Sequence, residues 1–247
     1  MIEDGLSQKQ GLELIWEWTS ARYLLRGSVK LIRTTTNIDL NVHPILTISS
    51  IGVEKLLKLA LGLRAVKDTG RFPSKGQMKH EFGHGSRGMF SKLIETLGPD
   101  LERDAPEGTL VRTALNELLA DPLFAPLLDL LTDYGMAARF FHLDAIAESP
   151  QDGYAPERRW DDLEAIAVKS FPEVNAAQQR IYETPGDDAA LTNFTALFHA
   201  RVSQTVERLW DLVCKLGVFG FLGDRGRQFG LDASEDLAFM NVENGRL

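Results

Sequence analysis

The residues of this chain with the clearest chemical potential lie in one short run, His80-Glu81-Phe82-Gly83-His84. On a helix, residues four positions apart share a face, so His80 and His84 would present two imidazoles side by side. Two histidines at this spacing, with a glutamate after the first, form the H-E-x-x-H pattern, in which the imidazoles bind zinc and the glutamate acts as general base. The pattern therefore indicates metal-assisted hydrolysis.

A zinc ion held in this way needs a third protein ligand, and Glu117 is the candidate. It lies in Asn116–Asp121, which resembles the segment that supplies the third ligand in thermolysin-like zinc peptidases. In this alternative, His80, His84 and Glu117 hold zinc. Glu81 then activates the water in the fourth coordination position. The alternative cofactor is therefore zinc, and the alternative activity is that of a zinc peptidase.

Three features of the surrounding sequence oppose the zinc interpretation. Gly83, Gly85 and Gly88 crowd the motif, and each costs a helix interior about 1 kcal/mol relative to alanine. Glu117 follows His84 by 33 residues, a longer separation than in the thermolysin-like group. Those peptidases also align substrate on a sheet edge, and no strand is expected beside this motif. We therefore favour a protein without a metal cofactor.

The elements that must position these residues are all expected to be helices. Apolar residues recur every three or four positions along most of the chain, and alternating, strand-like runs are scarce. The main expected helices cover residues 7–36, 45–63, 79–97, 109–120, 123–133, 136–147, 158–170, 174–183 and 187–216. Pro44 should make residues 41–44 a connector, Gly98-Pro99 should end the third helix, and Asp187 should cap the last. The expected fold class is all-α.

Turn-forming residues divide this expected bundle into a core and later additions. Residues 149–156 contain two prolines and a glycine and form the best internal boundary. Residues 1–148 should form the bundle core, and residues 149–222 should add helices that pack on the same core. Residues 223–247, rich in glycine and aspartate, are expected to form a loosely ordered tail.

Part of this pattern resembles the HEPN-like superfamily. The residues that carry the resemblance are Ser49–Leu59, Gly70–Ser74, Phe82-Gly83-His84, Phe90 and Leu93, with weaker support from Arg139–Asp144. The resemblance covers roughly residues 10–147 and implies an up-and-down bundle of long helices that forms a homodimer. Many HEPN-like domains are metal-independent ribonucleases, in which an arginine holds the phosphate while a histidine does acid–base work.

HEPN-like ribonucleases place four to six residues between that arginine and histidine, and no pair in this chain has the spacing. Arg71 and His80 are separated by eight residues, and Arg139 and His142 by two. The resemblance therefore implies a binding or assembly module, or a weak ribonuclease. Such proteins occur in stress responses, toxin–antitoxin systems and phage defence.

A small set of basic residues should carry any function of this kind. Catalysis would fall to His84, Arg87 and His80. RNA or another anion would be bound by Lys79, Arg87, Arg139 and His142. A protein is the alternative partner to RNA.

Overall composition limits the partners and the compartment. The 247 residues carry a net charge of −8, with a pI of about 5.2. This acidity argues against a surface coated with phosphate-binding groups but permits a local basic patch. Cys214 is the only cysteine, which excludes an intramolecular disulfide and argues against a cysteine-based zinc site. With no signal-like segment and no membrane span evident, we expect a cytosolic protein.

Overall fold

The computed structural model describes residues 5–36, 38–102 and 105–243. Within these ranges the regular elements are helices and no strand is present, so the all-α prediction is confirmed. None of the described helices combines the length and the apolar character that crossing a lipid bilayer requires.

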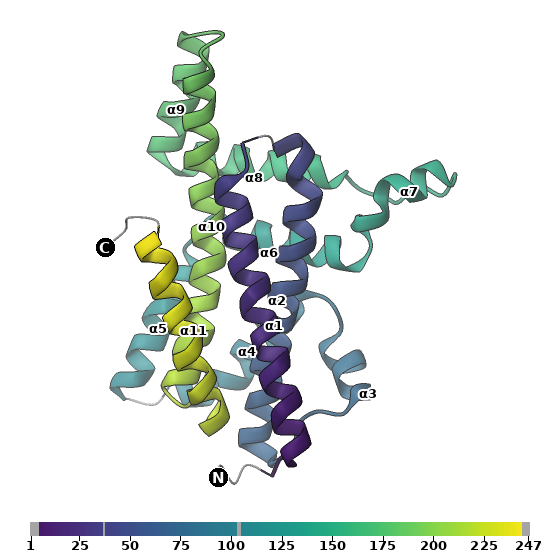
Figure 1. Cartoon of the computed structure of the whole chain (residues 1–247), viewed down its shortest axis with the longest axis vertical. Helices are drawn as coiled ribbons and strands as arrows, with labels where there is room; N and C mark the ends of the chain where they lie inside the picture. Colours follow the sequence, from purple (N-terminus) through teal and green to yellow (C-terminus); the bar gives the residue numbers. More distant parts are fainter. Residues whose placement is uncertain (1–4, 37, 103–104, 244–247) are drawn as a thin grey trace.

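Two long helices form the centre of the molecule. α1 (Gln8–Thr34) and α2 (Ile38–Thr69) run antiparallel and side by side (Figure 1). Ser7 and Gln10 start α1 with a capping box, in which each side chain accepts a hydrogen bond from the main-chain amide of the other. Apolar residues of the two helices pack against each other in the core. Buried members include Leu25, Val29 and Ile32 of α1 and Leu46, Val53 and Leu57 of α2.

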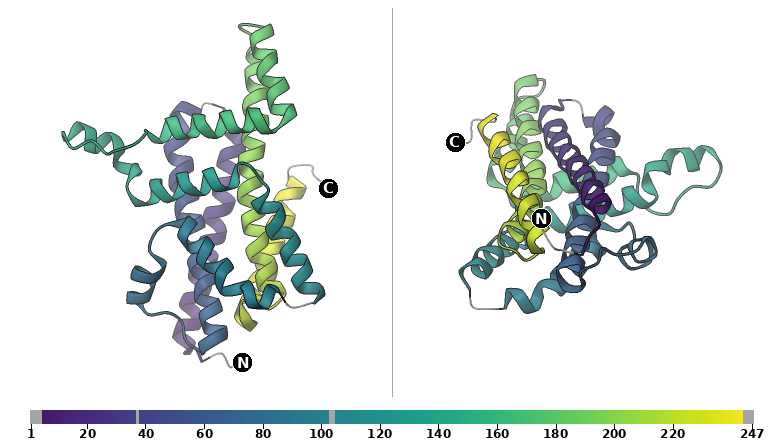
Figure 2. Two further views of the ribbon diagram at one scale, coloured as in Figure 1. Left: turned by 180° about the vertical axis from the view of Figure 1, so that it is seen from behind. Right: turned by 60° about the horizontal axis from the view of Figure 1, so that its bottom comes forward.

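The later helices pack around this pair. The longer ones are α4 (Ser86–Leu101), α5 (Pro106–Leu119), α6 (Phe124–Met136), α8 (Pro156–Ser170), α9 (Pro172–Glu183), α10 (Asp188–Val218) and α11 (Gly223–Glu243). The shorter ones are α3 (Lys75–Gln77), a π-helical turn (Met78–Phe82), a 3-10 turn (Ala138–Phe140) and α7 (Phe141–Ile146). α10 packs against α1, α5, α9 and α11. α9 and the start of α10 extend beyond the bundle at one end, and α7 projects to the side (Figures 1 and 2).

Two prolines lie inside helices that the sequence predicts to be interrupted. Pro44 is part of α2, which begins at Ile38, so the predicted connector at residues 41–44 is wrong. α4 likewise continues past Pro99 to Leu101. Each proline removes one helical hydrogen bond. Burial of the flanking residues Ile45 and Leu101 compensates for that loss. Asp187 caps α10 as predicted, since its side chain accepts hydrogen bonds from two main-chain amides of the first turn.

The predicted loosely ordered tail is wrong over its described part. Gly223–Glu243 forms α11, which packs along α10 with Phe229 and Ala233 buried. Phe229 also stacks on Trp18 of α1, with 5.0 Å between the ring centroids. Residues beyond Glu243 lie outside the described chain.

The glycines of this region explain the discrepancy. A Cβ atom on Gly230 would lie 2.6 Å from the main chain of Cys214 and Val218, and one on Gly217 would lie 2.3 Å from the Gly226 carbonyl oxygen. The two helices therefore touch backbone to backbone, which a side chain would prevent. Glycines that suggest a loose tail in the sequence serve instead as the contact surface between α10 and α11.

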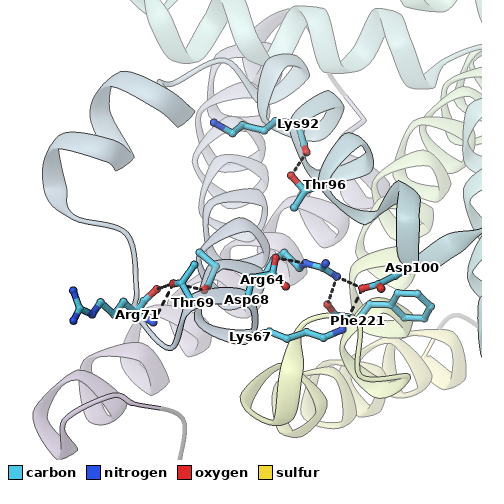
Figure 3. Close-up of polar contacts among 10 residues, drawn as sticks. Arg64, Lys67, Asp68, Thr69, Arg71, Lys92, Thr96, Asp100 and Phe221 are labelled. Atoms are coloured by element: carbon cyan, nitrogen blue, oxygen red, sulfur yellow. Dashed lines mark hydrogen bonds and ion pairs between the residues drawn. The ribbon is translucent and has the colours of Figure 1, made fainter.

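A buried arginine ties α2 to α4 and to the turn before α11 (Figure 3). Arg64 pairs with Asp100 of α4 and with Asp68, 2.7 Å away, and its Nη1 donates to the Phe221 carbonyl oxygen at 3.3 Å. Lys67 places a second cation 3.3 Å from Asp100. The hydrogen bond from Arg64 holds the pKa of Asp100 below its ordinary value. This network joins three segments that are distant in sequence.

Removing the anion from this network should destabilise the fold. We expect Asp100→Asn to lower the free energy of unfolding by roughly 2–4 kcal/mol, because Arg64 keeps a buried charge without its main partner. Because the folded-state pKa of Asp100 is lowered, its ion pair stabilises the native protein fully above the ordinary pKa of 3.8. This stabilisation is lost as the pH falls through the lower pKa of the folded state. Urea unfolding at pH 7 and pH 3 measures both effects. Glu102→Gln, at an exposed carboxylate nearby, is the control, and an equal loss in both variants would contradict this account.

α10 buries one histidine in the core. His199 is 1% exposed, and neither ring nitrogen has a hydrogen-bond partner within the described chain. Its ring packs against Trp160 at a centroid distance of 6.1 Å. Burial lowers the pKa of His199 to about 4, and the nearby main chain of Thr35 opposes the shift only in part. The folded protein therefore holds this imidazole neutral at pH 7.

This histidine should make the protein less stable in mild acid. Between the ordinary pKa of 6.5 and the folded value of about 4, the unfolded chain binds the extra proton, so stability falls as pH drops through this window. The difference between the two values corresponds to roughly 3 kcal/mol. Between pH 7 and pH 4, the free energy of unfolding of the native protein should therefore fall by roughly 3 kcal/mol more than that of His199→Leu. Urea unfolding at the two pH values measures the difference. An unchanged pH dependence in this variant would show that another group is responsible.

Candidate metal centre

Three helices bring two histidines and a glutamate together beside the start of α2. His43 belongs to α2, His142 to α7 and Glu157 to the first turn of α8. Oε1 of Glu157 lies 2.6 Å from Nε2 of His43 and 3.0 Å from Nε2 of His142. One ligand atom from each residue lies within 4.8 Å of the other two, a spacing at which a single ion can be held.

Glu157 is held ionised by its position at a helix start. Pro156 occupies the first position of α8, where its missing amide hydrogen costs no helical hydrogen bond. Partial burial raises the pKa of Glu157, but hydrogen bonds from its own main-chain amide, His142 and His43 outweigh burial and keep the pKa below its ordinary value. The helix dipole also favours a negative charge at this end. The site therefore presents a carboxylate anion at pH 7.

A hydrogen-bond chain behind His43 sets the orientation of its ring. Nδ1 of His43 lies 3.2 Å from the hydroxyl of Tyr134, which is buried. That hydroxyl lies 3.1 Å from Oγ1 of Thr47 and 3.3 Å from the carbonyl oxygen of His43. Without an ion, Nε2 of His43 donates to Glu157 and Nδ1 accepts from Tyr134. If an ion took the place of the Nε2 proton, Nδ1 would carry the hydrogen and donate to Tyr134, and the Nε2 lone pair would face the ion. Metal-binding histidines commonly donate their other ring N–H in this way.

Solvent reaches the ligand atoms from one side. The side chains of His43, His142 and Glu157 are 35%, 56% and 36% exposed. Oε2 of Glu157 is nevertheless buried and has no hydrogen-bond partner among the described residues, so one polar atom of the cluster is left unsatisfied. Two imidazoles, one carboxylate and an accessible fourth position form the ligand set of catalytic zinc sites. The cluster can therefore hold a zinc ion and expose it to substrate.

The H-E-x-x-H motif does not assemble in the same way. The π-helical turn ends at Phe82, Gly83 follows with a φ of +65°, and α4 starts only at Ser86. His80 and His84 therefore do not share one helical face. Within the described chain, the ligand atoms of His80, His84 and Glu117 do not come together as a group. The physical reason is the glycine-rich sequence, which ends the helix between the two histidines.

Most of the other predicted site residues have separate partners, and the rest are exposed. Nδ1 of His84 lies 2.9 Å from Oε1 of Glu54, Arg87 pairs with Asp129 of α6, and Glu81 lies 3.6 Å from the ammonium of Lys92. Lys79 and His80 are exposed, and the guanidinium of Arg139 lies 4.9 Å from the centre of the Phe140 ring. Of the predicted residues, only His142 joins the metal cluster. The basic residues assigned to RNA come from two separate segments, 79–87 and 139–142.

Sequence reasoning misses His43 and Glu157. The sequence places His43 in a predicted connector before Pro44 and Glu157 just after a predicted boundary. Glu157 is 114 residues from His43 and 15 from His142, so no short motif links them. The one available signal is His142, which lies in the Arg139–Asp144 segment that the sequence analysis singles out.

Comparisons with protein-family models, with curated proteins and with solved structures give no match for this chain. The HEPN-like relationship, RNA binding and dimerisation therefore stay predictions from the sequence.

Proposed function

We propose that this protein binds a divalent transition-metal ion, with Zn²⁺ the best fit, through His43, His142 and Glu157. The observation that carries the proposal is the convergence of three ligand atoms from α2, α7 and α8 within 4.8 Å. Imidazole nitrogen with one carboxylate suits zinc, whereas calcium and magnesium prefer ligand sets made of oxygen. The unsatisfied Oε2 of Glu157 supports a cation at this place, because a cation offers that atom a partner.

The reaction class that fits such a centre is hydrolysis. Structural zinc sites are closed by four protein ligands, whereas three protein ligands leave a position for water. A bound zinc ion lowers the pKa of that water to about 7 and so supplies hydroxide near neutral pH. His43 and His142 would act as neutral ligands and Glu157 as the anionic one. The proposal shares its chemistry with the zinc alternative drawn from the sequence but assigns different residues.

Zinc titration of four proteins tests the proposal. We expect the native chain to bind about one zinc ion, and His142→Ala and Glu157→Gln to weaken binding at least tenfold, because each removes a ligand. His80→Ala is the matched control, since it alters a histidine of the H-E-x-x-H motif, and it should bind zinc as the native chain does. Isothermal titration calorimetry gives stoichiometry and affinity, and circular dichroism confirms the fold. Binding lost in His80→Ala but kept in His142→Ala would overturn the proposal in favour of the motif.

The hydroxyl behind His43 provides a second, finer test. Tyr134→Phe keeps the buried ring but removes the group that Nδ1 of His43 faces. We expect the zinc affinity to fall by about tenfold, because partners that orient a ligand contribute at this level. Tyr154→Phe, at an exposed tyrosine, serves as the control. Equal zinc affinity in Tyr134→Phe and the native protein would show that the hydroxyl does not orient the ligand.

A further inference from the structure

The proposed metal centre takes one ligand from a segment that has little hold on the rest of the molecule. This segment, here called the arm, covers residues 137–155 between α6 and α8 and projects from the side of the bundle (Figures 1 and 2). No residue of the arm is buried, and Ala138, close to its start, is the one that packs against the hydrophobic core. Segments with few buried apolar contacts are those that open locally while the rest of a protein stays folded.

The base of the arm is fixed by the two helices on either side of it. α6 and α8 pack against each other, and Arg159 of α8 pairs with Asp133 of α6. The main-chain amide of Ala137 donates to the Asp133 carbonyl oxygen at 2.9 Å, which closes the end of α6. The arm can therefore open without separating α6 from α8, and two ligands, His43 and Glu157, stay in place when it does.

One side chain links the arm to the bundle beyond its base. Nε2 of His142 donates to Oε1 of Glu157 at 3.0 Å. The His142 ring also meets the His43 ring edge-on, with 5.6 Å between the centroids. Among the described residues, the arm's other side-chain hydrogen bonds, both from Gln151, stay within the arm. A single exposed hydrogen bond contributes little to stability, so without an ion His142 holds the arm weakly.

α7 does not hold its own shape. Phe141–Ile146 has six residues, and helices this short do not persist in water unless other parts of a protein support them. Leu143 and Ile146 are 62% and 79% exposed, so they provide no such support. Just after the helix, Glu148 has a φ of +58°, a left-handed conformation that is unfavourable for residues other than glycine. When His142 leaves the bundle, α7 should therefore unfold.

We propose that the bound metal ion latches the arm to the bundle and that loss of the ion releases it. This inference rests on the proposed function, because His142 is both the arm's link and a metal ligand. With an ion in the cluster, the arm can leave only if His142 gives up its coordinate bond. The two equilibria are therefore coupled: the factor by which arm opening weakens zinc binding is also the factor by which saturating zinc suppresses arm opening. Zinc thus completes its own site, since a released arm leaves two ligands.

Hydrogen–deuterium exchange of the full chain, followed by mass spectrometry, tests the latch. We expect saturating zinc to slow the exchange of the main-chain amides of residues 143–149 about tenfold or more, the same factor by which loss of the His142 ligand weakens zinc binding. Residues 75–82 are the internal control, because α3 and the π-helical turn likewise bury no residue but contain none of the proposed ligands. Zinc should leave the exchange of this control segment unchanged.

Two variants and a parallel zinc titration separate the latch from the metal centre itself. At the same zinc concentration, Glu157→Gln should keep fast exchange in the arm, whereas His80→Ala should behave as the native chain does. Zinc binding without slower exchange in residues 143–149 would overturn the latch and leave the metal centre standing. Slower exchange in residues 75–82 in place of the arm would overturn both, and so would absence of zinc binding to the native chain.

Gln151→Ala tests the coupling from the opposite direction. Gln151 is not a proposed ligand, but it holds the arm together by donating to the Ala137 carbonyl oxygen and to Asp144. Its loss should speed exchange in the arm and weaken zinc binding about threefold, because a smaller fraction of the protein then has His142 in place. Gln179→Ala, at an exposed glutamine of α9, is the matched control and should bind zinc as the native chain does. Native-like zinc affinity in a Gln151→Ala protein whose arm exchanges faster would overturn the coupling.

Discussion

The burial of α2 is the constraint on which the other features depend. This helix contacts α1, α4, α6, α8, α10 and α11, so it is surrounded over most of its length. Its packing outweighs an internal proline, Pro44, whose cost in a helix is about 3 kcal/mol or more. The features described above are spaced along it: His43 lies near its start, and Arg64 lies in the buried ion-pair network near its end. Displacing α2 would alter all of them at once.

The proposed metal centre combines this rigid helix with a weakly packed one. α7 has no buried residue, and Leu143 and Ile146 are 62% and 79% exposed. Gln151 donates hydrogen bonds to the Ala137 carbonyl oxygen and to Asp144, so these contacts stay within residues 137–151. His142 therefore stands on a helix with little apolar support, whereas His43 stands on one that other helices surround. In the proposed state, the ion would join the two.

The glycines of this chain act in two opposite ways that their sequence context does not distinguish. Gly83 ends a helix with a left-handed backbone and separates the two histidines of the zinc motif. Gly217, Gly226 and Gly230 lie within helices and allow α10 and α11 to approach until their backbones touch. The first role is local and can be predicted from glycine's conformational freedom. The second depends on which helix lies opposite, so the sequence predicts a loose tail where the structure has a packed helix.

The sequence by itself determined the all-α class, the approximate positions of most helices and the cap at Asp187, because helix formation depends on neighbours three or four residues apart. It also showed that glycines crowd the zinc motif. Only the tertiary structure decided which polar residues meet. His43, His142 and Glu157 share no spacing pattern, and Phe72 reaches Gly62 only because the segment between α2 and α4 folds back on α2. Such contacts depend on how whole helices pack, and the packing of distant segments leaves no periodic signal in a single chain.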